Sequence, residues 1–348
     1  MAGSADSFLQ RVWYGDSWLR FLLAPLGWIY SAIIALRRAL YAARLLPVKK
    51  LPVPVIVVGN LTVGGTGKTP LVLWLARQLA ERSLKPGIVS RGYGGRVGDT
   101  PLAVMADSDP ADVGDEAVLM ARHHTGPVVV HPDRVKAAEL AIARGAEVIV
   151  SDDGLQHLRL ARDVEIAVVD GERLFGNGWL LPAGPLREPL SRLMQIDQLV
   201  IQCDDGDLPD MTGLLRDARC FQLLASAICR LDDADIRNIA EFSGTTMHAI
   251  AGIGNPGRFF RMLSAHGIDV IPHPLADHAR IQQQDLEFDD DHEIVMTEKD
   301  AVKCRWLDTG RCWYVPVDVW LQNADAEYLL NDILRKIDEQ ATRRSVHG

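Results

Sequence analysis

One segment, residues 55–79, constrains this chain more than any other. Residues 55–58 are short, apolar and β-branched, which is typical of a buried parallel strand. A glycine-rich loop follows and ends in Gly67, Lys68 and Thr69, and the next residue, Pro70, is favoured in the first turn of a helix. Apolar residues then recur at helical spacing: Leu71, Leu75 and Leu79. A strand, a glycine-rich loop and a helix start in this order predict a P-loop.

Such a loop holds the β- and γ-phosphates of a nucleotide with backbone N–H groups and the positive end of the helix dipole. Lys68 would add a point charge, and the Thr69 hydroxyl would bind Mg²⁺. The usual pattern has a glycine six residues before the lysine, where this chain has Thr62, and Gly64 and Gly65 are expected to supply the missing freedom. The alternative is an ordinary strand–helix turn that carries a lysine. The predicted nucleotide-binding residues are Thr62, Val63, Gly64, Gly65, Thr66, Gly67, Lys68 and Thr69.

The length and the cysteine content bound the class of protein. A chain of 348 residues allows two or three domains and a sizeable core. We find no 18-residue apolar run that would span a bilayer and no cleavable signal pattern. The cysteines are odd in number and show no C-x-x-C spacing, so we expect reduced, cytosolic thiols rather than a disulfide frame or a zinc site. They are Cys203, Cys220, Cys229, Cys304 and Cys312.

Charge is distributed unevenly along the chain. The net charge is −9, but residues 1–50 carry seven Lys/Arg against two Asp and are therefore at +5, which leaves −14 on the remainder. An acidic body with a basic end argues against nucleic-acid binding and favours a local anionic partner.

The basic end is also apolar. Residues 21–36 contain no charged side chain and are interrupted by Pro25, so they are shorter than the ~20 residues of a spanning helix. Aromatic residues that suit a bilayer interface lie in and around this run. Arg37, Arg38, Arg44, Lys49 and Lys50 follow it. We predict a helix lying in the plane of the cytosolic leaflet, with its cations on anionic headgroups. A soluble helix packed on the core, or a dimer contact, is the alternative.

Strand and helix patterns alternate from residue 53 to residue 202, which predicts a doubly wound, mostly parallel α/β sheet. The expected strands are residues 55–58, 87–90, 128–131, 148–151, 166–170 and 199–202. A second, smaller α/β lobe is expected from "MHAIAGIGNP", "GIDVIPHPL", "EIVMTEKDA" and "CWYVPVDVW". The predicted division is a membrane-surface region over residues 1–50, a P-loop core over 51–243 and a smaller domain over 244–348.

Acidic and basic residues follow several of these strands. Asp152 and Asp153 end an apolar strand, as in the Walker-B arrangement that serves Mg²⁺. Asp115 and Glu116 start a helical pattern, where they either complement the helix dipole or supply a general base. His278, which follows Asp277, is one of ten histidines and carries little weight alone.

Three arginines lie close to strand ends or in glycine-rich segments: Arg91 in "SRGYGG", Arg134 in "HPDRVKAA" and Arg187 in "PAGPLREP". Surface ion pairs are the usual use of such residues. If the three lie in loops that face one cleft, they would instead bind phosphate in a bidentate manner.

An ordered set of motifs extends the reading beyond the P-loop. "GNLTVGGTGKTP", "SRGYGG", "GDE", "DDGLQH", "RDVEIAVVDGERLFGNGWLLPAGPLRE", "AGIGNPGRFF", "PLADH" and "MTEKDAVK" occur in this order. Together they resemble the tetraacyldisaccharide 4′-kinase family of lipid A biosynthesis, over residues 11–320. Thr62 matches that family's own variant of the loop.

The resemblance implies transfer of the ATP γ-phosphoryl group, with Mg²⁺, to the 4′-hydroxyl of a lipid A disaccharide 1-phosphate at the cytoplasmic face of the bacterial inner membrane. It makes Asp115 the base, His278 its partner and Lys68 a catalytic cation. It gives the metal to Thr69, Glu116, Asp152 and Asp153, and phosphate or substrate contacts to Asn60, Arg91, Arg134 and Arg187. It also makes "QHLRLARD" a mobile hairpin near the cleft. Lys299 and Asp300 of "TEKDAVK" are expected to be structural.

Two other classes of protein share part of this pattern. A membrane-tethered ATPase switch would carry a signature lysine before its paired glycines, where this chain has Val63, and a GTPase would need an N-K-x-D motif, whose spacing "TEKD" does not match. A non-catalytic nucleotide-binding scaffold would tolerate loss of the Asp115 carboxylate, whereas a kinase would not.

Overall fold

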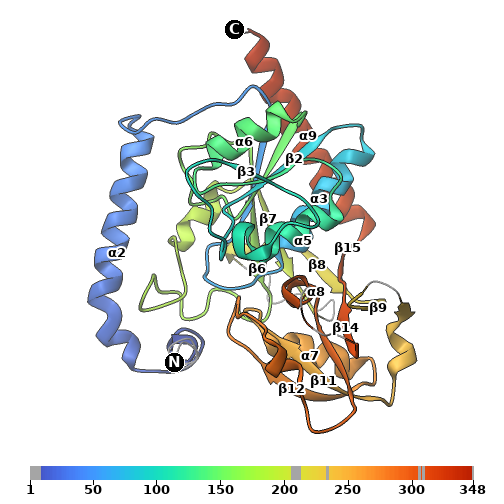
Figure 1. Cartoon of the computed structure of the whole chain (residues 1–348). Coiled ribbons are helices and arrows are strands. Elements are labelled where there is room, and N and C mark those ends of the chain that lie inside the picture. The colour runs from blue at the N-terminus through green and yellow to red at the C-terminus, as the bar shows by residue number, and fades with distance from the viewer. Residues whose placement is uncertain (1–8, 205–212, 233–234, 305–306, 308–309, 347–348) are drawn as a thin grey trace.

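The computed structural model shows a body of two lobes, each built around one sheet, with the long helix α2, Leu19–Ala42, lying beside it (Figure 1). It describes residues 9–204, 213–232, 235–304, 307 and 310–346. The upper part in Figure 1 carries the P-loop and the larger sheet, and the lower part carries the smaller sheet.

The larger sheet has nine strands in the order β15-β8-β7-β6-β1-β5-β2-β4-β3. Strands β1, β2 and β4 to β8 pair in parallel, and β3 and β15 are antiparallel strands at the two edges. All six expected strands are present. The bounds are β1 Val55–Gly59, β2 Pro86–Ser90, β3 Leu102–Val104, β4 Val128–Val130, β5 Val148–Asp152, β6 Val164–Asp170, β7 Gln198–Gln202, β8 Arg219–Leu224 and β15 Asp318–Leu321.

Helices cover both faces of this sheet because its strands alternate their side chains. In β1, Ile56 and Val58 face a core formed with α3, α5 and α9, whereas Val55 and Val57 face a core formed with α6. The predicted doubly wound architecture is therefore confirmed. The helix bounds are α3 Lys68–Glu81, α4 Pro110–Val113, α5 Asp115–His123, α6 Arg134–Ala143 and α9 Asn323–Val346, with the 3₁₀ turns η1 Leu190–Gln195 and η2 Gly213–Leu215.

The smaller sheet has six strands in the order β10-β9-β14-β13-β11-β12. Its four strands β11 to β14 pair in parallel, and β9 and β10 add to it in antiparallel fashion. The bounds are β9 Ala227–Arg230, β10 Ile236–Asn238, β11 Thr246–Ala251, β12 Asp269–Pro274, β13 Glu293–Thr297 and β14 Cys312–Val315. Helices α7 Pro256–Ala265 and α8 Glu298–Ala301 and the turns η3 Ile239–Phe242, η4 Gln283–Leu286 and η5 Val302–Cys304 complete this lobe.

The smaller sheet does not coincide with the predicted domain of residues 244–348 at either end. Strands β9 and β10 precede residue 244 yet belong to the smaller sheet, and β15 and α9 return to the larger one. The segment "CWYVPVDVW" is therefore divided, with β14 in one sheet and β15 in the other. Alternating patterns predict that strands exist, but not which sheet an edge strand joins.

Helix α2, Leu19–Ala42, contains 24 residues and is longer than the apolar run predicted it to be. It is the one helix in the described part of the chain that is long and apolar enough to cross a membrane, judged by length and composition. Only Ala24 and Gly27 are buried within it. Its outward side chains include Trp28 at 67% and Ile33 at 58% exposure.

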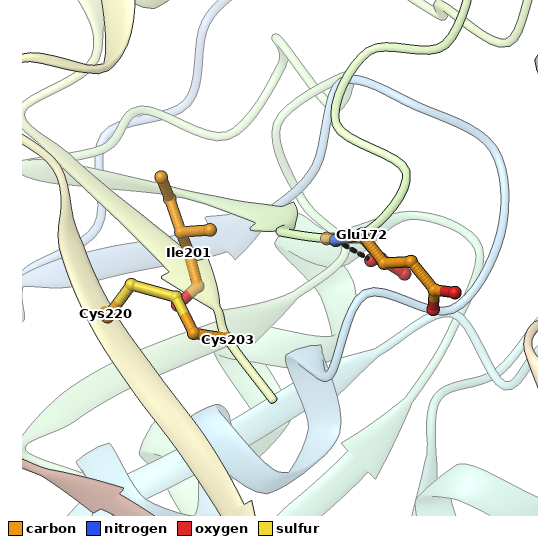
Figure 2. Close-up of a disulfide and its surroundings, with 5 residues drawn as sticks. Glu172, Ile201, Cys203 and Cys220 are labelled. Atoms are coloured by element: carbon orange, nitrogen blue, oxygen red, sulfur yellow. Dashed lines mark hydrogen bonds between the residues drawn. A yellow bond between two sulfur atoms is a disulfide. The ribbon is translucent and has the colours of Figure 1, made fainter. Parts of the chain in front are cut away.

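Two further expectations are wrong. Cys203 and Cys220 form a disulfide, with a Cα–Cα distance of 5.9 Å (Figure 2), because the parallel pairing of β7 with β8 brings them together although 17 residues separate them. Cys229, Cys304 and Cys312 are buried free thiols. The "QHLRLARD" segment, residues 156–163, forms turns and one isolated bridge, from Leu160 to Lys49, and therefore no hairpin.

Candidate active site

The P-loop connects the end of β1 to the start of α3 at Lys68. Gly64 has a positive φ of 113°, as expected, whereas Gly65 does not have a positive φ, and the second residue in that conformation is Gly67 at 76°. A Cβ atom on Gly67 would lie 2.7 Å from the Gln202 side-chain oxygen. Asn60 was predicted to contact phosphate or substrate. Its side-chain amide donates to the Gly64 carbonyl oxygen at 3.3 Å and so stabilises the conformation of the loop.

Cations of the site converge on Asp153. Its carboxylate lies 2.8 Å from Arg187 Nη1 and 3.8 Å from Lys68 Nζ, while Arg134 Nη2 donates to its backbone carbonyl at 3.3 Å. Burial acts to raise the pKa of Asp153, but Lys68 and Arg187 outweigh it and lower the pKa to about 2. Asp153 is therefore a fixed negative charge beside the P-loop lysine.

Asp152 ends β5 and is buried. Its Oδ2 accepts from Ser90 Oγ at 3.3 Å, whereas Oδ1 has no hydrogen-bond partner among the described residues. Burial, followed by the charges of Glu116 and Asp153, raises the pKa of Asp152 to about 7. A buried carboxylate oxygen without a donor, facing two other acids, is an environment that a cation would stabilise.

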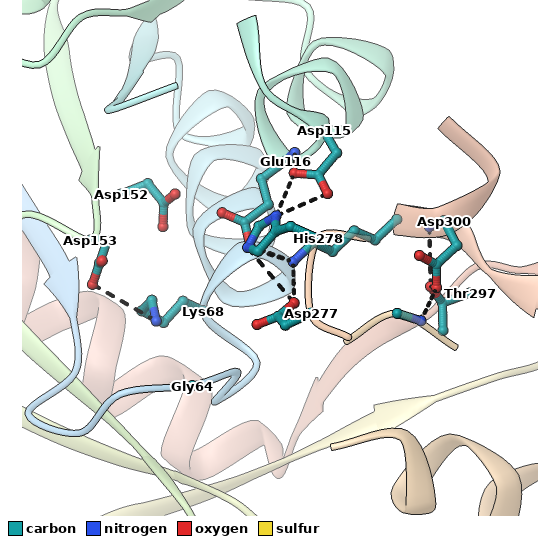
Figure 3. A network of polar contacts seen from close by, with 12 residues as sticks. Gly64, Lys68, Asp115, Glu116, Asp152, Asp153, Asp277, His278, Thr297 and Asp300 are labelled. Atoms are coloured by element: carbon teal, nitrogen blue, oxygen red, sulfur yellow. Dashed lines mark hydrogen bonds and ion pairs between the residues drawn. The ribbon is translucent and has the colours of Figure 1, made fainter. Parts of the chain in front are cut away.

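Asp115 and His278 form a pair that joins the two lobes (Figure 3). His278 Nδ1 lies 3.1 Å from both carboxylate oxygens of Asp115, and the Tyr93 ring packs on the imidazole at a centroid distance of 4.7 Å. Burial acts to raise the pKa of Asp115, but the hydrogen bond from His278 and the charges of Lys299 and Lys303 lower it overall. Burial acts to lower the pKa of His278, but Asp115 raises it overall.

Lys299 belongs to this site, although its sequence context indicated a structural role. Its Nζ lies 3.1 Å from Glu116 Oε1, 3.2 Å from Asp277 Oδ1 and 3.2 Å from His278 Nε2. Burial lowers the pKa of Lys299, but these acids raise it overall, so the side chain is a permanent cation. Its position just after the parallel strand β13 is the signal that could have identified it, because ligands bind at the carboxyl ends of such strands.

Asp300 does have structural contacts. It accepts from Thr297 Oγ1 at 2.7 Å and from the Gly252 backbone N–H at 2.8 Å, and it is fully buried.

The three predicted arginines do not all lie in loops. Arg134 is the first residue of α6 and is buried, Arg187 lies in the loop after β6, and Arg91 follows β2 and is exposed. Burial lowers the pKa of Arg134, and among the charges that act on it are Asp152, Asp153 and Arg91. Arg134 and Arg187 are therefore both bound to Asp153, and Arg91 lies close enough to Arg134 for its charge to act on it.

These features define a class. A P-loop at the carboxyl edge of a parallel sheet, an acid at the end of the neighbouring strand and a carboxylate–imidazole pair from two lobes are the parts of a P-loop phosphotransferase.

Comparison with known proteins gives the family. The profile of the LpxK family, Tetraacyldisaccharide-1-P 4′-kinase, matches residues 19–335. The tetraacyldisaccharide 4′-kinase of Nitrosococcus oceani is 47% identical over 318 residues, which cover 91% of each chain, and that of Coxiella burnetii is 44% identical over 342 residues, which cover 97% of this chain and 98% of the other. The chain belongs to this kinase family.

A solved structure agrees with this assignment. The crystal structure of LpxK from Aquifex aeolicus in complex with ATP superposes with a TM-score of 0.72 at 31% identity, covering 92% of this chain and 99% of that one.

Proposed function

We propose that the chain transfers the γ-phosphoryl group of ATP to the 4′-hydroxyl of a tetraacyldisaccharide 1-phosphate, the lipid A precursor. The observation that carries the proposal is the Asp115–His278 pair, held at 3.1 Å on the second-lobe side of the P-loop site. A kinase for a hydroxyl acceptor needs a proton acceptor there, whereas a nucleotide switch does not. The ATP complex of the Aquifex aeolicus relative supports ATP as the donor.

The P-loop would bind the donor through the backbone amides of residues 62–69, with the Lys68 ammonium on the terminal phosphates. Lys68 and Arg187 both pair with Asp153 in this structure. The phosphate oxygens would therefore bind beside cations that already lie together. Arg91 and Arg134 are proposed to contact phosphates from the same edge of the sheet. Preformed cation positions of this kind lower the reorganisation that binding requires.

Mg²⁺ fits the same edge. The described residues contain no group of three or more His, Cys, Asp or Glu that could hold a metal unaided. Mg²⁺ sites with one or two carboxylates completed by phosphate oxygens and water are common. Asp152, whose Oδ1 lacks a partner, is the best placed ligand, and Asp153, Glu116 and the Thr69 hydroxyl are the further candidates. When bound, the ion would neutralise charge on the phosphates.

Asp115 would accept the proton of the acceptor hydroxyl. Its lowered pKa keeps it ionised at neutral pH, and His278 fixes its orientation. Because Asp115 starts α5 in the first lobe and His278 follows β12 in the second, the base is complete only where the two lobes meet.

We propose that α2 carries the enzyme to the cytosolic leaflet of the bacterial inner membrane, where an acylated sugar would lie. One side of α2 packs on the protein: Tyr30 OH donates to the Arg187 carbonyl at 3.0 Å, and Gly27 approaches Ala183 closely. The opposite side exposes large apolar residues. A helix held along the body in this way supports an in-plane orientation, in which the membrane surface would lie beside the loop of Arg187.

The activity test uses purified protein, Mg-ATP and detergent-dispersed tetraacyldisaccharide 1-phosphate. We expect phosphorylated lipid, little ATP hydrolysis without lipid, and a kcat lowered by about 10²–10⁴-fold in Asp115→Asn. Asp107→Asn, at an exposed position, is the matched control and should leave kcat unchanged. Equal ATP turnover with and without lipid would exclude the kinase and favour an ATPase switch.

The membrane test compares sedimentation with vesicles that contain anionic phospholipid. Deleting residues 1–44 should release the protein, and Ile33→Glu on the exposed side of α2 should weaken binding. Ile236→Glu, equally exposed but located on β10, is the control and should bind as the unchanged chain does. Unchanged sedimentation after the deletion would exclude α2 as the anchor.

A further inference from the structure

Helix α8 of the smaller lobe reaches across to α5 of the larger lobe at two points. Glu298 Oε1 lies 2.6 Å from His123 Nε2 at the last residue of α5, and Lys299 Nζ lies 3.1 Å from Glu116 Oε1 at its start. The two contacts differ in their surroundings. The first is an ion pair alone, whereas the second also meets the Asp115–His278 pair.

Lys299 uses all of its donors. An ammonium group carries three N–H bonds and no lone pair, so it can only donate. Its three partners are Glu116 Oε1 at 3.1 Å, Asp277 Oδ1 at 3.2 Å and His278 Nε2 at 3.2 Å, and its side chain is 15% exposed. The nearby Lys303 pairs with Asp300 at 2.6 Å and lies 3.9 Å from Asp115 Oδ2, so it contributes charge to Asp115, but its ion pairs in the described part of the chain do not include His278.

The contact with His278 has a chemical consequence. Because Lys299 can only donate, its contact with His278 is a hydrogen bond only when Nε2 accepts, and this requires the neutral imidazole with its proton on Nδ1. Nδ1 is the atom that lies 3.1 Å from both oxygens of Asp115, so its N–H points at the carboxylate. With the opposite tautomer, two lone pairs would face each other across that distance.

We propose that Lys299 is a positioning residue for the phosphoryl transfer: it fixes the Nδ1–H tautomer of His278 and, through it, the orientation of the Asp115 carboxylate. The inference rests on the proposed function, because it assigns Lys299 to the same Asp115–His278 pair. Lys299 acts through His278, and Asp115 is the group that would accept the proton of the hydroxyl.

The test compares Lys299→Met, Lys299→Arg and Glu298→Gln. Glu298→Gln removes the charge from the other polar contact between α8 and α5, as Lys299→Met does from the first, and is therefore the matched control for electrostatic docking of the two helices. Histidine tautomers are read by NMR of protein labelled with ¹⁵N in its histidine rings, with His278→Asn to assign the signal. The lipid phosphorylation assay gives kcat and the two KM values, and thermal unfolding verifies that each variant is folded.

We expect Nδ1–H at His278 in the unchanged protein, in Glu298→Gln and in Lys299→Arg, which still presents only donors. In Lys299→Met, Asp277 Oδ1, which lies 3.7 Å from Nε2, would compete with Asp115 for the imidazole proton without an opposing cation. We therefore expect the Nδ1–H tautomer to be lost, with kcat lowered at least about tenfold, part of the range that acid–base groups contribute, and KM for ATP little changed. Lys299→Arg should recover part of kcat.

Three results would overturn the inference: Nε2–H at His278 in the unchanged protein, which needs no variant to fold; an unaltered tautomer in Lys299→Met; or equal losses of kcat in Lys299→Met and Glu298→Gln. Failure of the proposed function is a different result, because the unchanged protein would then phosphorylate no lipid.

Discussion

The protonation state of a residue in this site depends on its neighbours as well as on its own residue type. Asp152 and Asp153 are adjacent in sequence, yet burial and two acids raise the pKa of the first to about 7, while Lys68 and Arg187 lower that of the second to about 2 against the effect of burial. A cation would therefore stabilise Asp152, whereas Asp153 already has two cationic neighbours, Lys68 and Arg187. The same rule makes a measurable prediction at His157, which lies 3.5 Å from Asp133.

Burial, followed by the charge of Arg134, lowers the pKa of His157 from 6.5 to about 4. Between these two values the unfolded chain binds a proton that the folded protein does not, so the free energy of unfolding should rise with pH across this window. His157→Gln should flatten that part of the pH profile, measured by urea unfolding at several pH values. His123→Gln is the comparison, because the hydrogen bond to Glu298 raises the pKa of His123 and its contribution is lost only as pH rises above 6.5. An identical slope in His157→Gln and the unchanged protein would contradict the assignment.

At the scale of elements, the P-loop shows how a short segment is determined by its neighbours. Gly67 stands at φ 76° before α3, and Gln202 of β7 and Phe221 of β8 close the space where a Cβ would lie. Gly65 in turn packs against Gly254, which lies between β11 and α7. The loop is therefore held from both lobes, which makes its backbone a rigid receptor for phosphate.

Gly67→Ala should combine backbone strain with a steric clash. The left-handed conformation costs a non-glycine residue about 1–2 kcal/mol, and a Cβ 2.7 Å from the Gln202 oxygen would displace the loop. We expect a lower free energy of unfolding and weaker ATP binding by calorimetry. Gly145→Ala is the control, because Gly145 also has a positive φ of 96° but open space around it. It should show only the loss of stability, and equal ATP affinity in the two variants would contradict the argument.

The whole molecule consists of two lobes, and the chain passes from the larger lobe to the smaller one and then back to the larger one. After the smaller sheet is complete, β15 pairs with β8 at the edge of the larger sheet, and α9 packs Leu329, Leu330, Ile333 and Ile337 into its core. The C-terminal segment therefore belongs to the P-loop lobe, which the predicted range 51–243 leaves out. We propose that the larger lobe depends on residues from both ends of the chain.

Leu330→Ala tests this dependence. The residue is 1% exposed, and removing such a side chain from a core costs about 2–5 kcal/mol. Urea unfolding should show that loss, and a fragment of residues 51–243 should fail to fold cooperatively. Leu224→Ala, at a site 46% exposed on β8, is the control and should change stability by less than about 0.5 kcal/mol. A cooperatively folded 51–243 fragment would show that α9 is dispensable.

Much of the fold was predictable because its signals are local. Six strands of the larger sheet, the start of α3 and the placement of Asp115 at a helix start follow from periodicity and loop composition. Strands β3 and β8, the sheet that β15 joins, the Cys203–Cys220 pair and the length of α2 were not predicted. Each of them depends on which distant segment lies alongside, and a window of neighbouring residues does not contain that information.

The same division applies to the candidate site. Strand ends and glycine spacing place Lys68, Thr69, Asp152 and Asp115 by themselves, because a P-loop is built from consecutive residues whose amides point at one phosphate. Lys299 is different. It lies 183 residues from Glu116 in the chain and acquires its partners only when α8 packs on α5. Sequence alone thus determined the phosphate loop and the chemical class. The tertiary structure decided which side chains complete the Asp115–His278 pair, because hydrogen bonds between lobes depend on packing and not on the spacing of residues in the sequence.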